Sequence, residues 1–203
     1  DVACGTGDIA FRFLKRAKGS TATVLDMTES MLVEGRKRAD AENMADRLDW
    51  IVGDAMALPF PDSSFDVYTI SFGIRNVTRI PDALSEAYRV LRPGGRLVFS
   101  LDHPARDCFF DEEAGELLPY PARSYFDETP VRWSFDSPRV RMQSYHRTVA
   151  TWIDLLNAAG FCLARLLEPA PPVAMLDDLW PEDDPRAPLR NLPQCAIFLA
   201  RKM

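Results

Sequence analysis

Two residue types that mark common classes of protein are scarce in this sequence. The 203 residues include two histidines and four cysteines, and the cysteines are far apart, with no Cys-x-x-Cys pair. Such spacing predicts free thiols in a reduced compartment and argues against a disulfide framework or a metal site. Long apolar runs are missing as well, because none approaches the roughly 20 residues that a membrane-spanning helix needs.

Basic residues are also fewer than acidic ones. The chain has 24 lysine and arginine residues against 30 aspartate and glutamate residues, a formal net charge of -6. Nucleic-acid-binding domains usually carry a basic face, so no nucleic-acid partner is expected. We expect a cytoplasmic protein. A peripheral membrane contact is left open, since residues 11–18 form a weak amphipathic candidate, and the sequence does not indicate an oligomeric state.

Strand and helix patterns alternate through the first half of the chain, which is typical of an α/β fold with a parallel sheet. On the first helix, Ile9, Phe13 and Leu14 are expected to form the buried face. The pattern predicts strands at residues 21–26, 48–52, 65–71 and 96–101, and helices at residues 8–19, 28–39 and 81–91.

The pattern changes at residues 103–141, which are rich in proline, aromatic and acidic residues. Such a stretch between strands usually covers a site. Its aromatic residues are candidates either for lining an apolar substrate pocket or for filling the core beneath a lid. They are Phe109, Phe110, Tyr120, Tyr125, Phe126, Trp133 and Phe135. Regularity returns with a helix at 148–160, a strand at 161–168, a proline-rich loop at 169–193 and a last strand at 195–200.

These patterns predict one domain over residues 1–203, with a Rossmann-like, doubly wound sheet of seven strands. The sheet is expected to be mostly parallel, with an antiparallel last strand. Residues 1–101 form the expected cofactor-binding half, and residues 102–203 form the substrate side with an insertion at 103–141. Because Asp1-Val2-Ala3 is only the tail of a central strand, we expect the chain to be N-terminally truncated.

The first eight residues combine a strand end, a glycine turn and a helix start. Gly5 and Gly7 allow the backbone to turn tightly and to approach a ligand, although they also suit a plain turn. Asp26 ends the next strand, about 20 residues later, where a carboxylate can accept hydrogen bonds from both ribose hydroxyls. The combination predicts a ligand that contains adenosine, and both NAD and S-adenosylmethionine fit it.

Two later segments carry a resemblance to a known family. Residues 53–66 (GDAMALPFPDSSFD) resemble the segment after the third strand of class I S-adenosylmethionine-dependent methyltransferases, and residues 91–95 (LRPGG) resemble the turn before their fifth strand. A nicotinamide oxidoreductase is therefore disfavoured. Residues 71–78 (SFGIRNVT) are similar to a signature of the ubiE/COQ5 family of ubiquinone/menaquinone biosynthesis C-methyltransferases, as are the opening motif and residues 24–32.

The resemblance covers roughly residues 1–100. It implies S-adenosylmethionine as the cofactor, with Asp54 and Ala55 in contact with the adenine. The full set of cofactor-binding residues that we expect is Gly5, Thr6, Gly7, Asp26, Met27, Asp54, Ala55 and Ser71.

After Leu101 this resemblance ends, and Tyr145-His146-Arg147-Thr148 looks more like a segment of general small-molecule methyltransferases. A phenol or hydroquinol becomes a better nucleophile when a base removes its proton, and His103 and His146 are the candidate bases. A proline turn after His103 and a helix cap at His146 are the structural alternatives. Tyr145 and Arg147 are candidates for orienting the acceptor.

Three functions are compatible with the whole sequence. The first is C-methylation of a demethylated polyprenyl quinol in ubiquinone/menaquinone biosynthesis. The second is O-, N- or C-methylation of another small molecule, which the divergent second half favours. The third is a truncated or chimeric domain that binds the cofactor without catalysis.

Overall fold

The computed structural model, which describes residues 1–134 and 141–203, has an α/β fold built on a mixed sheet. β3 (Phe65–Ser71) and β4 (Leu91–Asp102) pair in parallel. β10 (Cys195–Lys202) lies antiparallel between β4 and β9 (Phe161–Leu167), so the strand order is β3-β4-β10-β9. The last strand is therefore antiparallel, as the sequence predicts.

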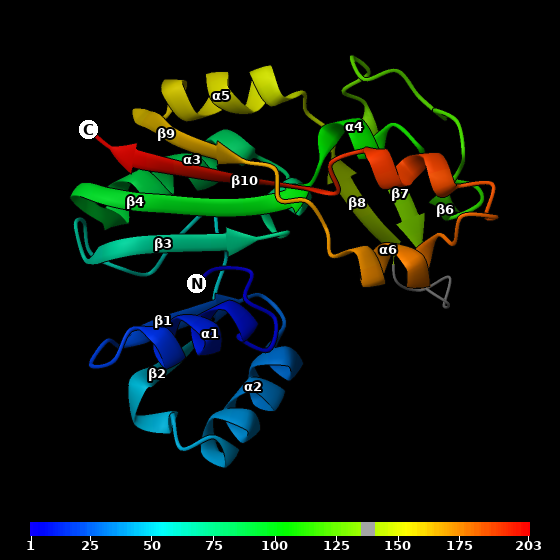
Figure 1. Ribbon diagram of the computed structural model, residues 1–203. Helices are drawn as coiled ribbons and strands as arrows, with labels where there is room; N and C mark the ends of the chain where they lie inside the picture. The colour runs from blue at the N-terminus through cyan, green and yellow to red at the C-terminus, as the bar shows by residue number, and fades with distance from the viewer. Residues whose placement is uncertain (135–140) are drawn as a thin grey trace.

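A second, parallel pair joins this sheet through the first residues of the chain. β1 (Ala22–Asp26) pairs with β2 (Leu48–Val52). The N–H of Val2 donates to the Thr69 carbonyl of β3 at 2.8 Å, and the N–H of Leu25 in β1 donates to the Asp1 carbonyl at 2.9 Å. The N-terminus thus lies between the two groups of strands (Figure 1).

Helices cover the sheet and form its core. α3 (Ile80–Val90) and α5 (Val149–Ala158) pack with β4 and β9, and α5 extends along β9 and β10 in Figure 1. At the centre of this core the ring of Phe99 stacks on Phe198, with centroids 4.7 Å apart, and lies 5.3 Å from Trp152. These side chains are nearly inaccessible, so their burial holds α5 and β10 to β4.

α1 (Asp8–Arg16) and α2 (Glu29–Ala41) accompany β1 and β2. The predicted face of α1 is wrong at two positions, because Ile9 and Phe13 are exposed whereas Phe11 and Leu14 are fully buried. Phe11 packs against Trp50 of β2, with ring centroids 6.3 Å apart. Part of the apolar side of residues 11–18, the weak amphipathic candidate, therefore serves the core.

Apart from η1 (Ala45–Arg47), which directly precedes β2, the remaining elements lie beyond the carboxyl ends of β3 and β4 (Figure 1). Two of them, α6 (Val173–Leu179) and the 3-10 helix η3 (Ala187–Asn191), fall in residues 169–193, so the prediction of a loop there is wrong. Leu176, Trp180 and Leu189 bury a small core of their own. The others are η2 (Ile74–Asn76), α4 (Pro104–Asp107), β5 (Phe110–Asp111), β6 (Glu116–Leu117), β7 (Pro130–Ser134) and β8 (Arg141–Tyr145).

The aromatic residues of the predicted insertion have different surroundings. Phe126 and Tyr120 are exposed, whereas Phe109 packs against the small core around Leu176. Phe135 lies outside the described residues, as does the side chain of Trp133. Within the described part of the chain, no helix has both the length and the apolar character needed to cross a membrane.

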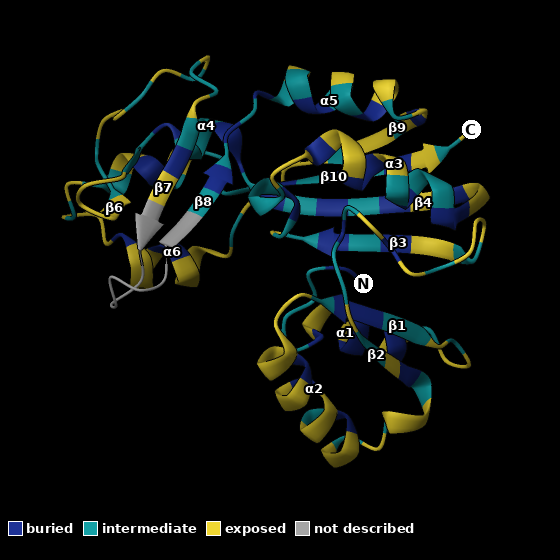
Figure 2. Ribbon diagram, turned by 180° about the vertical axis from the view of Figure 1, so that it is seen from behind, coloured by how far each residue is buried: buried dark blue, intermediate teal, exposed yellow. Residues whose placement is uncertain are grey.

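Gly35 provides a test of how α2 packs on β2. Figure 2 shows that the outer side of α2 is exposed, but Gly35 is buried, and a Cβ there would lie 2.2 Å from the Trp50 ring. Alanine is the better helix former by roughly 1 kcal/mol, but overpacking costs about 1–3 kcal/mol. We expect Gly35→Ala to lower the free energy of unfolding in urea by roughly 1–2 kcal/mol.

The matched control is Asp40→Ala, an exposed position of the same helix. This substitution should change the free energy of unfolding by less than about 0.5 kcal/mol. A Gly35→Ala variant more stable than the unmodified chain would show that α2 does not pack as described.

Candidate functional site

A cleft of about 350 Å³ opens beside the carboxyl ends of β1, β2 and β3. In doubly wound folds this edge of the sheet is where ligands bind. Three loops and the first residues of the chain form the walls. The lining residues are Val2, Ala3, Leu25, Asp26, Met27, Gly53, Asp54, Ala55, Met56, Gly73, Asn76, Val77 and Thr78.

The glycine turn lies next to this cleft. Gly5 and Gly7 have φ angles of 55° and 85°, values that L side chains rarely adopt. A Cβ on Gly7 would also lie 3.0 Å from the Trp50 ring. Thr6 is half-buried between the two glycines. None of these three predicted cofactor residues is among the lining residues, and the turn instead connects to the cleft through Asp26.

Asp26 holds three loops together at the end of β1. One carboxylate oxygen accepts the N–H of Gly5 at 2.8 Å, and the other accepts the N–H of Thr28 at 2.8 Å. Its backbone carbonyl accepts the N–H of Gly53 at 3.0 Å. Because each carboxylate oxygen has a second lone pair, Asp26 can still accept hydrogen bonds from a ligand.

The loop after β2 contributes the second carboxylate of the cleft. One side-chain oxygen of Asp54 accepts the N–H of Met56 at 2.8 Å, and its backbone carbonyl accepts the N–H of Ala57 at 3.1 Å. Ala55 is buried behind this turn, and Met27 lies exposed on the opposite loop. Four predicted cofactor residues, namely Asp26, Met27, Asp54 and Ala55, thus line one cleft.

The wall after β3 differs from the prediction. The hydroxyl of Ser71 is 2.5 Å from that of Ser100 on β4, so the side chain bridges two strands rather than lining the cleft. The residues Gly73, Asn76, Val77 and Thr78 take that place. The buried Oδ1 of Asn76 has no hydrogen-bond partner among the described residues. The sequence signal was the SFGIRNVT run itself, of which only Ser71 was selected.

His103 connects the ends of two strands. Its Nδ1 accepts the N–H of Ala105 at 3.1 Å, at the start of α4. The proton therefore sits on Nε2, which donates to the carboxylate of Glu168, just past β9, at 2.8 Å. The ring is buried. This geometry fits the structural alternative for His103, and its role as a base stays a prediction.

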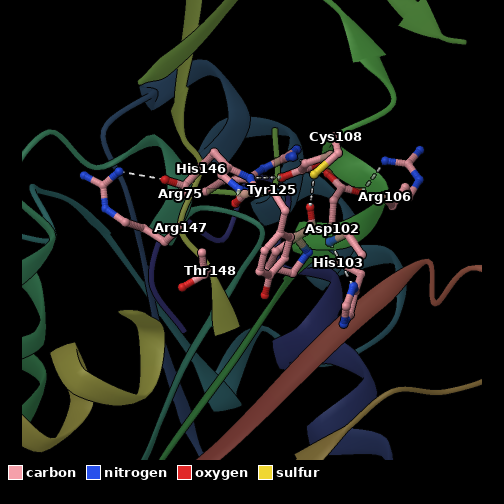
Figure 3. A network of polar contacts seen from close by, with 12 residues as sticks. Arg75, Asp102, His103, Arg106, Cys108, Tyr125, His146, Arg147 and Thr148 are labelled. Carbon is pink, nitrogen blue, oxygen red and sulfur yellow. Dashed lines mark hydrogen bonds and ion pairs between the residues drawn. The ribbon is translucent and has the colours of Figure 1, made fainter. Parts of the chain in front are cut away.

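His146 lies deeper, just past β8. Its Nε2 donates to the Tyr125 carbonyl at 2.9 Å, and Nδ1 is 3.8 Å from a carboxylate oxygen of Asp107. Burial raises the pKa of the Asp107 carboxyl above its ordinary value, while His146 acts in the opposite direction. Figure 3 shows both histidines within a network of polar contacts. The predicted role of His146 as a base is not decided by these contacts.

Tyr145 and Arg147 belong to the same network. The hydroxyl of Tyr145 accepts a hydrogen bond from the Gln143 amide at 2.7 Å. The Arg147 guanidinium donates to the carbonyls of Glu128 at 3.0 Å and His146 at 2.6 Å. Both side chains thus have partners within residues 102–203, and their contact with an acceptor remains a prediction.

One ion-pair network was not predicted from the sequence. Asp102, at the end of β4, pairs with Arg75 of η2 and with Arg106 of α4, the latter at 3.2 Å. Arg106 in turn donates to the Gln194 side chain at 3.0 Å. The network joins the cleft wall after β3 to the elements of the second half (Figure 3). Arg75 lies in the SFGIRNVT run, so its position, though not its partner, could have been identified.

Comparison with known proteins gives a consistent result. The model of the ubiE/COQ5 methyltransferase family matches residues 1–120. The chain is 52% identical over 186 residues to the ubiquinone/menaquinone biosynthesis C-methyltransferase UbiE of Cereibacter sphaeroides, covering 89% of this chain and 72% of that protein. It is 79% identical to UbiE of Dinoroseobacter shibae over 123 residues, covering 59% and 49% of the two chains.

The solved structures agree on the fold. A crystal structure of an S-adenosylmethionine dependent methyltransferase from Mesorhizobium loti superposes with a TM-score of 0.77 at 25% identity. The superposition covers 100% of this chain and 89% of the other. The likeness of fold therefore extends through residues 121–203, which the family model does not match.

The thiols provide a test of the packing around Asp26. Burial, with the nearby Asp26 carboxylate, raises the pKa of Cys4 to about 12, whereas Cys162 is exposed. Only the thiolate reacts with alkylating reagents, so iodoacetamide at about pH 8 should modify Cys162 much faster than Cys4. Peptide mass spectrometry over a time course measures both rates, and equal rates would contradict the described packing of the glycine turn.

Proposed function

Since the chain belongs to the ubiE/COQ5 methyltransferase family, we propose that it transfers the methyl group of S-adenosylmethionine to a ring carbon of a demethylated polyprenyl quinol in ubiquinone/menaquinone biosynthesis. The relatives named as C-methyltransferases of that biosynthesis support the reaction. The observation that carries the proposal is the cleft, which Asp26, Asp54 and Asn76 line together. A nucleoside with an amino acid tail presents groups complementary to that set.

The chain's own residues have distinct roles in holding the cofactor. We propose that Asp26 accepts hydrogen bonds from the ribose hydroxyls, because its carboxylate lies in the cleft and is held rigid by two backbone N–H groups. Asp54 and Ala55 contact the adenine from the loop after β2. Gly5, Thr6 and Gly7 bring the backbone close to the remaining part of the cofactor, and Ser71 acts by holding β3 to β4.

When bound, S-adenosylmethionine supplies a methyl group on a positively charged sulfur, which is a good leaving group. The protein must align the acceptor carbon with that methyl group and exclude water. Such positioning can contribute roughly 7–11 kcal/mol to lowering the barrier. A base that removes a phenolic proton makes the ring carbon more nucleophilic, and His103 and His146 stay candidates for it.

We also propose that the two halves of the chain have different roles. Residues 1–101 hold the cofactor, and residues 102–203 contribute to acceptor binding within one domain. The hydrogen bonds of Asp1 and Val2 to β1 and β3 support a seven-stranded sheet in which residues 1–3 take the central position.

A second candidate function is methylation of another small molecule. The observation in its favour is that the family model stops at residue 120, while β7, β8, α5, β9, α6 and β10 all lie beyond it. In this fold, differences in that half change which acceptor can reach the cofactor. The two candidates share the cofactor site and differ only in the acceptor.

An assay with quinones extracted from cells distinguishes the two candidate functions. We expect the purified chain, given S-adenosylmethionine with a labelled methyl group, to methylate reduced quinones from cells that lack this ring methylation. Mass spectrometry of the quinone fraction should show one added label on the ring. Transfer to water-soluble phenols alone would favour the second candidate, and no transfer to either would favour a non-catalytic domain.

Asp26→Asn tests the cofactor role in the same assay. Loss of the charge should weaken its hydrogen bonds, each of which contributes about 1.5–3 kcal/mol when charged, and should lower kcat/KM for S-adenosylmethionine roughly 10- to 100-fold. The control is Asp49→Asn, an exposed aspartate on β2. Equal activity of the two variants would show that Asp26 does not bind the cofactor.

A further inference from the structure

Phe72 has an unusual backbone conformation at the edge of the cleft. Its φ angle is 60°, in the left-handed region that bulky residues rarely occupy. It comes directly after the last residue of β3. Strained residues of this kind persist where the surrounding structure fixes them, and they cluster at functional sites.

Two contacts explain why the chain keeps this conformation. The N–H of Phe72 donates to the Ser100 carbonyl of β4 at 2.7 Å. The next residue, Gly73, packs so closely on Ala3 that a Cβ there would lie 2.3 Å from the Ala3 Cβ. The chain is therefore fixed on both sides of the strained residue, and a glycine at position 72 would be the relaxed solution.

The benefit of phenylalanine at this position is not core packing. Its side chain is 42% exposed, whereas Ile70 and Ile74 on either side are 1% exposed. The exposed ring directly precedes Gly73, the first residue of the cleft wall after β3. The Arg75 guanidinium, which pairs with Asp102, lies 5.8 Å from the ring centroid.

We propose that Phe72 is a specificity-determining residue, on whose exposed face the aromatic ring of the acceptor stacks. This inference rests on the proposed function and deepens it. An electron-rich phenolic ring prefers offset or edge contacts with another aromatic ring and is attracted by a nearby cation. Phe72 and Arg75 present both features beside the cleft, outside the residues assigned to the cofactor.

Phe72→Gly separates this role from a structural one, because glycine adopts the observed φ without strain. We expect a melting temperature no lower than that of the unmodified chain. We also expect the KM for the reduced quinone to rise roughly 3- to 10-fold, the range of an aromatic pair. The dissociation constant for S-adenosylhomocysteine, measured by calorimetry, should stay unchanged.

Two further variants complete the series. Phe72→Tyr keeps the aromatic face and should retain the acceptor KM. Phe13→Leu is the matched control, since Phe13 is 41% exposed on α1, away from the cleft lining, and should alter neither constant. If Phe72→Gly lowers the melting temperature, Phe72→Leu is used in its place. We expect the same rise in the KM for the reduced quinone in that variant, because leucine also lacks the aromatic ring.

An unchanged acceptor KM in Phe72→Gly or Phe72→Leu would overturn the inference. Weaker binding of S-adenosylhomocysteine would also overturn it, because the substitution would then act on the cofactor site. Failure of the unmodified chain to methylate the reduced quinone, with S-adenosylhomocysteine still bound, would instead overturn the proposed function on which the inference rests.

Discussion

The organisation of the cleft depends on the hydrogen bonds that Asp26 accepts. Its carboxylate fixes the glycine turn through Gly5 and the start of α2 through Thr28, and its backbone holds Gly53. Hydrogen bonds to a charged acceptor contribute about 1.5–3 kcal/mol each, more than neutral ones. Three loops from separate parts of the chain therefore keep one arrangement before any ligand arrives, which lowers the cost of ordering them on binding.

A second constraint connects this cleft to the second half of the chain. The close approach of Gly73 and Ala3 joins the loop after β3 to the first residues of the chain. On the other side of the same loop, Asp102 pairs with Arg75 and Arg106. The SFGIRNVT run thus lies between the cleft and the second half of the chain, in contact with both.

Local signals predicted the strands and the turn around the cleft. The strands, the glycine turn and Asp26 follow from alternation, φ requirements and spacing, and the structure places Asp26, Met27, Asp54 and Ala55 along one cleft. The limits of the buried face of α1 were harder to predict, because Ile9, Ala10, Phe11, Phe13 and Leu14 make a broad apolar side of which only Ala10, Phe11 and Leu14 are buried. Phe11 is buried because it packs against Trp50 and the cluster around Val24 and Leu48.

The second half was harder for a different reason. Its prolines at residues 169–193 conceal α6, which is stable because Leu176 packs on Trp180 and Leu189 rather than through a long amphipathic pattern. Ser71 was chosen by resemblance, yet its partner Ser100 lies 29 residues away on β4. That pairing depends on sheet register, and the pairing of Arg75 with Asp102 depends on where η2 packs at the end of β4; local sequence encodes neither.

The most direct test of this account is a calorimetric titration of the chain with S-adenosylhomocysteine and, separately, with NAD. Both ligands carry an adenosine that Asp26 can hold, and only the first matches a methyltransferase cleft. The account predicts saturable binding of S-adenosylhomocysteine at one site per chain and no measurable binding of NAD. Binding of NAD with no binding of S-adenosylhomocysteine would contradict it.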